Sequence, residues 1–198
     1  MLKIGITGGI GSGKTTICKV FETMGIPVFY ADTVAKQLMV TDELLMSGVR
    51  HTFGTESYAA DGTLNNKHIA AIVFNNADEL ARLNALVHPA VFRAFEVWVK
   101  QVPAHVPYVL KEAALLFESG SYKMCDQNIL VLAPEAARLQ WVMERDGVSA
   151  AQVKARMDKQ LPDEEKMKLA DHLIYNNETA SLIIQVLRLH QLFLNKPE

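Results

Sequence analysis

Cysteine is scarce in this sequence, and neither sign of charge is in excess. The 198 residues include two cysteines, Cys18 and Cys125, which lie far apart and form no C-x-x-C pair. We therefore expect no disulfide framework. Lysine and arginine number 20 and aspartate and glutamate number 22, so the formal charge is −2. A protein built mainly to hold nucleic acid would show a basic excess, and we predict no nucleic-acid partner.

Long hydrophobic runs are also missing. The longest, Ile69–Phe74, is far shorter than the roughly 20 residues that cross a bilayer. The N-terminal residues read as the start of a strand rather than as a secretory signal. We therefore expect a cytoplasmic protein without a membrane partner. Hydrophobic residues make up 49% of the chain, which is enough for a full core and too many for disorder.

The first thirty residues predict a βαβ unit. Residues 3–7 are partly β-branched and run into glycines, as a buried strand does. Helical spacing of apolar residues over 14–24 stops at Gly25, and a second strand-like run covers 26–30. Strand, helix and strand in this order are typical of a parallel sheet, so the predicted fold class is α/β.

Residues 33–102 change character and predict a helical insertion after the second strand. A turn is expected at Asp61-Gly62, and Asn65 suits a helix cap. A break in the helices is expected around Asn84, His88 and Pro89.

The α/β pattern then returns. Strand-like runs cover residues 108–113, 128–133 and 173–175. Helices are predicted to begin at Pro134-Glu135, at a capping box over residues 149–152 and after a cap at Thr179. One apolar stripe is expected on the last helix, from Leu182, Ile183, Val186, Leu187, His190 and Phe193.

Residues Gly8–Thr15 match the phosphate-binding pattern G-x-x-x-x-G-K-[ST] between a strand and a helix. The glycines let backbone N–H groups approach phosphate oxygens, and the positive end of the following helix favours the same anion. Lys14 adds a full charge, and the Thr15 hydroxyl suits Mg²⁺. A glycine-rich turn without a ligand is the alternative, and this context counts against it. The motif predicts nucleotide binding, but GTPases, ATPase motors and small-molecule kinases all share it.

Two acids lie at the carboxyl ends of predicted strands, and ligands bind at this edge of the sheet in open α/β folds. Asp32 suits either a general base for a substrate hydroxyl or a cap of the helix that begins at Thr33, and position alone favours neither. Glu112 suits either a group that orients metal-bound water or a polar strand terminus.

The helix predicted from Pro134 carries Arg138, Trp141 and Arg145 on one face, at spacings of three and four. Arginines that close over a nucleotide stabilise the charge of the transferring phosphoryl group. A solvated basic stripe is the alternative. The histidines show no metal-ligand spacing, and Cys18 is expected in the core.

Together these residues resemble the dephospho-coenzyme A kinase family over nearly the whole chain. The matching segments are Gly5–Thr16, Ala31-Asp32, Asp61–Leu64, Phe74, Leu83-Asn84, His88-Pro89, Leu115–Glu118, Arg145-Asp146, Arg156, Gln160, Lys166, Ala170-Asp171 and Asn176.

This resemblance implies transfer of the γ-phosphoryl group of ATP, with Mg²⁺, to the ribose 3′-hydroxyl of dephospho-coenzyme A. The implied fold is a P-loop kinase core with a five-stranded parallel sheet. Residues 1–36, 103–135 and 161–198 would form the core, 37–102 a substrate-binding insertion and 136–160 a lid. The oligomeric state is left open.

The same resemblance assigns roles to single residues. Asp32 would be the base, Arg145 a catalytic lid arginine and Thr15 the metal ligand. His88, Leu116 and Glu118 would bind the acceptor together with Asp32. Nucleotide contacts would come from Gly9, Gly11, Ser12, Gly13, Lys14, Thr15, Thr16 and Arg138.

Three positions depart from the family pattern: Tyr30 replaces an acid, Ala114 a proline and Trp141 an arginine. Another P-loop kinase, acting on a nucleoside monophosphate or a small metabolite, is the rival enzyme. A regulatory GTPase would need a guanine-reading N-K-x-D motif, which the segment Asn66–Ile69 does not complete. A catalytically silent nucleotide-binding module is the third alternative.

Overall fold

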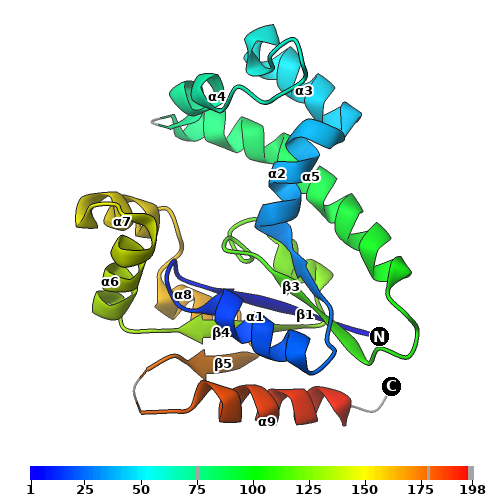
Figure 1. Ribbon diagram of the computed structural model, residues 1–198, viewed down its shortest axis with the longest axis vertical. Coiled ribbons are helices and arrows are strands. Elements are labelled where there is room, and N and C mark those ends of the chain that lie inside the picture. The colour runs from blue at the N-terminus through cyan, green and yellow to red at the C-terminus, as the bar shows by residue number, and fades with distance from the viewer. Residues whose placement is uncertain (75, 178, 196–198) are drawn as a thin grey trace. The chain divides into compact units, whose positions relative to one another are not determined.

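Figure 1 shows the computed structural model, which describes residues 1–74, 76–177 and 179–195. The chain forms two compact units. Residues Met1–Tyr30 and Val102–Glu198 make the first, and Ala31–Gln101 make the second.

A parallel sheet is the centre of the first unit. Its strands lie in the order β2-β3-β1-β4-β5, and neighbouring strands pair in parallel throughout this order. The predicted five-stranded parallel α/β core is thereby confirmed. The strands are β1 (Leu2–Gly8), β2 (Val28–Tyr30), β3 (Tyr108–Glu112), β4 (Gln127–Leu132) and β5 (His172–Tyr175).

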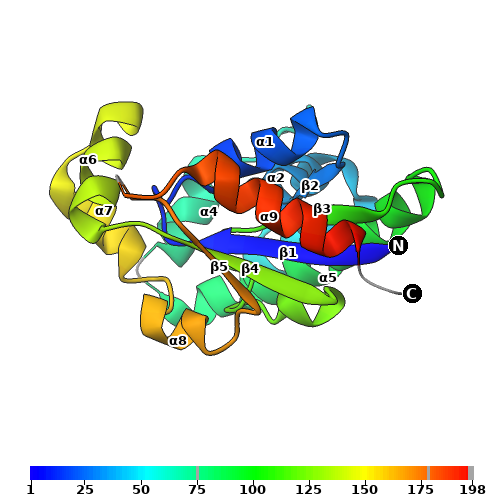
Figure 2. The same ribbon diagram turned by 90° about the horizontal axis from the view of Figure 1, so that it is seen from below.

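Helices α1 (Lys14–Thr23) and α9 (Leu182–Leu194) pack against each other and against the sheet. Figure 2 shows them on one side of the sheet, with α8 (Asp163–Met167) on the other. Helix α1 buries Ile17 and Phe21, and α9 buries Val186 and Phe193. Burial of such apolar side chains is the main term that stabilises the unit.

Two further helices, α6 (Glu135–Asp146) and α7 (Ala150–Met157), pack as a pair. Pro134 precedes α6, as predicted. The predicted capping box is confirmed, because the Ser149 hydroxyl accepts from the Gln152 N–H and the Gln152 side chain accepts from the Ser149 N–H. A short 3₁₀ helix, η2 (Ser121–Met124), follows β3.

The second unit is helical and has its own core. It contains α2 (Ala31–Thr41), α3 (Glu43–Phe53), η1 (Thr55–Ser57), α4 (Asn66–Val73) and α5 (Ala77–Gln101). The predicted turn is confirmed by Gly62, whose φ is 83°. Asn65 caps α4 as predicted, since its side chain accepts from the His68 N–H at 3.1 Å. The core of this unit is formed by Met39, Leu45, Val49, Phe53, Tyr58, Ile69 and Ala90.

Two boundary predictions were wrong. Asn84, His88 and Pro89 do not break the helices, because α5 runs through all three. Proline inside a helix costs about 3 kcal/mol, and the packing of α5 against α2, α3 and α4 outweighs this cost. Thr179 does not cap α9, because it bonds to Asn177 and the cap is Ser181.

The apolar stripe of α9 is also narrower than predicted. Val186 and Phe193 are buried, whereas Ile183 and Leu187 are 58% and 44% exposed. The helix therefore presents apolar side chains to solvent as well as to the sheet.

Both cysteines are free thiols, and burial raises the pKa of each. Cys18 lies in the core as expected, and the pKa of Cys125 is raised to about 11. At pH 8 the reactive thiolate of Cys125 is then about a thousandfold less abundant than the thiol.

We expect iodoacetamide to label neither cysteine of the native protein within minutes, and both after unfolding in guanidinium, as measured by mass spectrometry. Rapid labelling of the native protein at pH 8 would contradict this.

Candidate active site

The loop between β1 and α1 turns through two left-handed glycines, Gly11 at φ 78° and Gly13 at φ 94°. A residue with a Cβ is strained in this region of φ/ψ space. A side chain at position 13 would also come within 2.6 Å of the Asn176 amide nitrogen. The loop is therefore a fixed turn, and it delivers the chain directly into α1.

Lys14 is the first residue of α1, and its side chain lies along the loop. Its Nζ donates to the carbonyls of Gly8 at 2.9 Å and Gly9 at 3.3 Å. Thr15 and Thr16 follow it and are exposed. The N-cap of α1 is Gly13, which has no side chain to accept from the first N–H groups of the helix. The buried Ser12 hydroxyl also has no hydrogen-bond partner within the described parts of the chain. The Lys14 ammonium, the hydroxyls of Ser12, Thr15 and Thr16 and the N–H groups at the start of α1 are donors that fit an anion at the loop.

Two side chains from late in the sequence hold the loop. The Asn176 amide nitrogen donates to the Ser12 carbonyl at 2.9 Å. The Gln160 side chain accepts from the Ile10 N–H at 2.8 Å and donates to the Ala114 carbonyl at 3.0 Å. Gln160 thus connects the loop to the segment that follows β3. Both residues matched the family pattern, but their bonds run between segments more than 40 residues apart, and sequence spacing alone could not find them.

The two arginines of α6 have different environments. Arg138 is 12% exposed, pairs with Asp163 at 3.3 Å and covers Gly9, where a Cβ would overlap the guanidinium. Arg145 is 64% exposed, and Asp146 accepts from it at 2.7 and 3.1 Å. These hydrogen bonds raise the pKa of Arg145 and lower that of Asp146.

A cavity of about 540 Å³ opens beside the loop. Residues of the loop and of the start of α1 form one part of its wall and α6 forms another. Its lining residues are Gly11, Gly13, Lys14, Thr15, Thr16, Trp141, Val142, Arg145, Asn176 and Leu182. The structure therefore brings most of the predicted nucleotide contacts, together with Arg145, the arginine predicted for the lid, to one cavity.

Asp32 is exposed in the first turn of α2, two residues after the end of β2. The chain continues from β2 into α2 without a loop, so Asp32 follows the carboxyl end of this strand as predicted. Tyr30, which replaces an acid of the family pattern, hydrogen-bonds to Glu22, and burial raises its pKa. Glu112 ends β3, as predicted, and is buried opposite Tyr30 and Ile6 in the sheet register.

The other predicted acceptor contacts serve packing and loop structure within their own units. The His88 ring stacks on Phe92 within α5, with centroids 6.2 Å apart. Leu116 is fully buried. Glu118 pairs with the buried Lys166 at 3.5 Å and accepts from the Leu161 N–H at 2.9 Å.

Neither a membrane span nor a protein-built metal cluster is found in the described residues. No helix there has the length and apolarity to cross a bilayer. No group of three or more histidine, cysteine or acidic side chains is arranged to hold a metal ion among the same residues. A metal at this site would depend on the Thr15 hydroxyl and on oxygens of the ligand, which suits Mg²⁺ because it keeps several waters and phosphate oxygens.

Comparison with known proteins decides between the families that share such a loop. The family model for dephospho-CoA kinase matches residues 2–181. A dephospho-CoA kinase of Salinibacter ruber is 46% identical over 180 residues, which are 90% of each chain. One of Chlorobaculum tepidum is 39% identical over 183 residues, which are 90% of this chain and 88% of the relative. This chain belongs to the dephospho-CoA kinase family.

Solved structures match the chain over nearly its whole length. The protein TT1252 from Thermus thermophilus matches with a TM-score of 0.85 and 32% identity over 98% of both chains. A dephospho-CoA kinase from Campylobacter jejuni matches with a TM-score of 0.66 and 27% identity over 96% of this chain and 95% of that one. A shikimate kinase from Acinetobacter baumannii, at 15% identity and a TM-score of 0.53, shares the fold.

We predict that Gln160 keeps the loop in its anion-binding conformation. Gln160→Leu removes two hydrogen bonds, each contributing about 1 kcal/mol, and should weaken ADP binding about tenfold in calorimetry. Gln140→Leu is the matched control, because Gln140 is exposed and bonds within α6 to Glu144. Equal ADP affinity in the Gln160 variant and the control would contradict the prediction.

Proposed function

We propose that this chain transfers the γ-phosphoryl group of ATP to the ribose 3′-hydroxyl of dephospho-CoA, giving CoA and ADP. The observation that carries the proposal is the fixed loop of residues 8–15, with Lys14 along it, in a chain that the dephospho-CoA kinase family matches over residues 2–181. The acceptor is a small molecule that carries the hydroxyl to be phosphorylated.

In the proposed step, the 3′-oxygen attacks the γ-phosphorus and a new O–P bond forms. The bond from the γ-phosphorus to the bridging oxygen breaks, and that oxygen leaves on ADP. The hydroxyl proton passes to the carboxylate of Asp32. The support for this base is an exposed carboxylate two residues after β2, at the ligand-binding edge of a parallel sheet.

Residues of the loop would position the donor and stabilise its charge. Backbone N–H groups of the turn and the start of α1 would bind phosphate oxygens, and the Lys14 ammonium would exchange its loop carbonyls for them. Mg²⁺, which Thr15 would help to hold, would neutralise charge on the donor phosphates when bound.

The arginines of α6 would act on the same donor from the side of a lid, residues 136–160. Arg138 already covers Gly9, and Arg145 lines the cavity. Both guanidiniums are paired with carboxylates, so each would change partner to bind phosphate oxygens. We propose that residues 1–36, 103–135 and 161–198 act as the core.

The insertion, residues 37–102, would bind the acceptor, with His88 on its longest helix. A pocket of about 520 Å³ within the second unit is a candidate for part of this contact, and Asp61–Leu64 belong to its lining. Leu116 and Glu118 would support the acceptor indirectly, since their described contacts lie within the first unit.

The acceptor is tested directly. The protein is incubated with Mg-ATP and one of dephospho-CoA, AMP, CMP or shikimate, with Lys14→Ala as the blank. We expect phosphate transfer to dephospho-CoA, at a rate at least a hundredfold above the blank because Lys14 holds the donor. Transfer to AMP, CMP or shikimate in preference to dephospho-CoA would overturn the proposal.

The base is tested by Asp32→Asn. We expect kcat to fall on the order of 10²-fold or more, with ADP affinity unchanged in calorimetry, because the amide cannot take the proton. Asp78→Asn is the matched control, because Asp78 is an exposed acid in the first turn of α5. If Asp32 only stabilised the start of its helix, the two variants would lose the same small amount of stability and keep their kcat.

A further inference from the structure

Trp141 is a large aromatic side chain left partly in solvent beside the phosphate-binding loop. It is 40% exposed on α6, whereas the next residue, Val142, is 1% exposed. The chain has two tryptophans, and the other, Trp98, lies in the second unit, with its ring 6.2 Å from that of Phe95. An aromatic ring exposed to water does not contribute the stabilisation that burial of its apolar surface would give.

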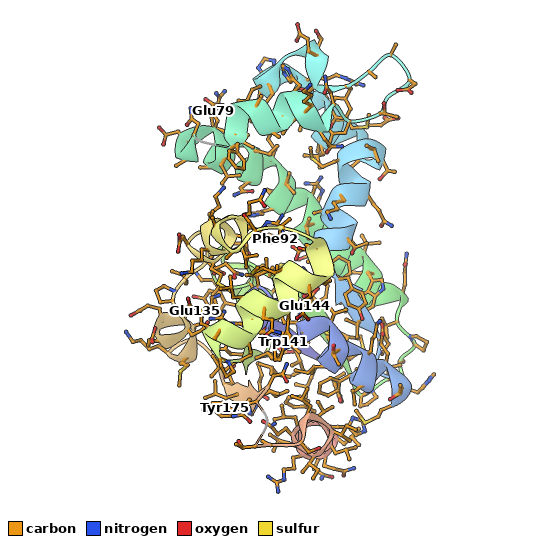
Figure 3. All side chains as sticks on the ribbon, turned by 60° about the vertical axis from the view of Figure 1, so that its left-hand side comes forward. Glu79, Phe92, Glu135, Trp141, Glu144 and Tyr175 are labelled. Atoms are coloured by element: carbon orange, nitrogen blue, oxygen red, sulfur yellow. The ribbon has the colours of Figure 1, made fainter. Side chains whose placement is uncertain are left out.

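The cavity that Trp141 lines has two chemically different parts. Lys14, Thr15 and Thr16 supply charge and hydroxyls on one part of its wall. Trp141, Val142 and Leu182 supply apolar surface on another. In Figure 3, Trp141 lies between α6 and the beginning of α1. This division matches a ligand with an anionic chain and a flat, largely apolar ring system.

The polar side chains beside the apolar part already have partners. The Asn176 amide nitrogen donates to the Ser12 carbonyl, and the Arg145 guanidinium, which bonds Asp146 through two nitrogens, would turn to phosphate oxygens in the proposed function. Neither donor is then directed at the edge of a ring. Contact with the face of a ring is therefore the interaction that the apolar part of the cavity offers most directly. The indole of tryptophan is the side chain best suited to it.

We propose that the Trp141 indole stacks on the base of the donor nucleotide and favours purines over pyrimidines. This inference rests on the proposed function and specifies how the same site selects its donor. A purine has two fused rings and covers more of the indole face than a pyrimidine does. Base–aromatic stacking tolerates different bases, so ATP and GTP gain from it alike, and CTP and UTP gain less.

The first test uses fluorescence. Trp98→Phe leaves Trp141 as the single tryptophan, and its emission is followed while ADP, CDP or inorganic tripolyphosphate is added, with binding of each measured by calorimetry. We expect strong quenching by ADP, weaker quenching by CDP and none by bound tripolyphosphate, which has no ring. Equal quenching by bound tripolyphosphate, or no change with bound ADP, would overturn the proposal.

The second test separates the ring from the phosphates. Trp141→Leu should weaken ADP binding about tenfold, and Trp141→Phe should restore most of the loss because it keeps an aromatic face. Neither variant should change the affinity for tripolyphosphate, which also shows that the loop is intact. Equal losses for ADP and tripolyphosphate would mean a structural role and overturn the inference.

Failure of the inference and failure of the proposed function give different results. If ADP binds and dephospho-CoA is phosphorylated while the two Trp141 variants match the parent in ADP affinity, the stacking role is wrong and the kinase assignment stands. If the parent binds tripolyphosphate but not ADP, the nucleotide donor itself is wrong, and both fall.

Discussion

The proposed function requires the turn between β1 and α1 to hold backbone N–H groups toward the donor phosphates, and several contacts of the first unit fix the shape of this turn. Two glycines adopt left-handed φ values to make the turn. Asn176 and Gln160, from the far end of the chain, bond the loop from outside it. One of these contacts comes from the edge of the sheet, since Asn176 directly follows β5.

Two cationic side chains of the first unit, Arg138 and Lys166, are paired with acids. Arg138 covers Gly9, whose carbonyl accepts from Lys14, and its pairing with Asp163 offsets the repulsion between these two cations. The buried Lys166 is paired with Glu118. A buried cation without a partner would cost several kcal/mol, so these acids keep the cationic groups in place. These two ion pairs therefore hold cationic side chains in position within the first unit.

Much of the fold could be predicted because local patterns agree with tertiary packing. The βαβ unit, the capping box at Ser149 and the cap at Asn65 are decided by neighbouring residues. Pro89 and Thr179 were misjudged for the opposite reason. The packing of α5 outweighs the local cost of a proline, and Thr179 is drawn into a turn with Asn177 two residues before the true cap. Rules based on neighbouring residues cannot predict whether local preference or tertiary packing dominates at such positions.

The site could be predicted where its chemistry lies in consecutive residues. The loop of residues 8–15 is a local signal, whereas the Gln160 and Asn176 bonds and the Trp141 wall depend on which segments the fold brings together. Asp32 was found from its place after a strand, and its role in catalysis stays a prediction.

Gly9 differs from Gly11 and Gly13 in the reason that a glycine stands at its position. Gly9 is not among the residues with positive φ, so its backbone conformation would accept an ordinary side chain. A Cβ at this position would overlap the Arg138 guanidinium, which would have to move to make room for it. The identities of residues 9 and 138 are therefore linked: in related sequences, a larger residue at the first position should occur only where the arginine at the second has been lost or turned away.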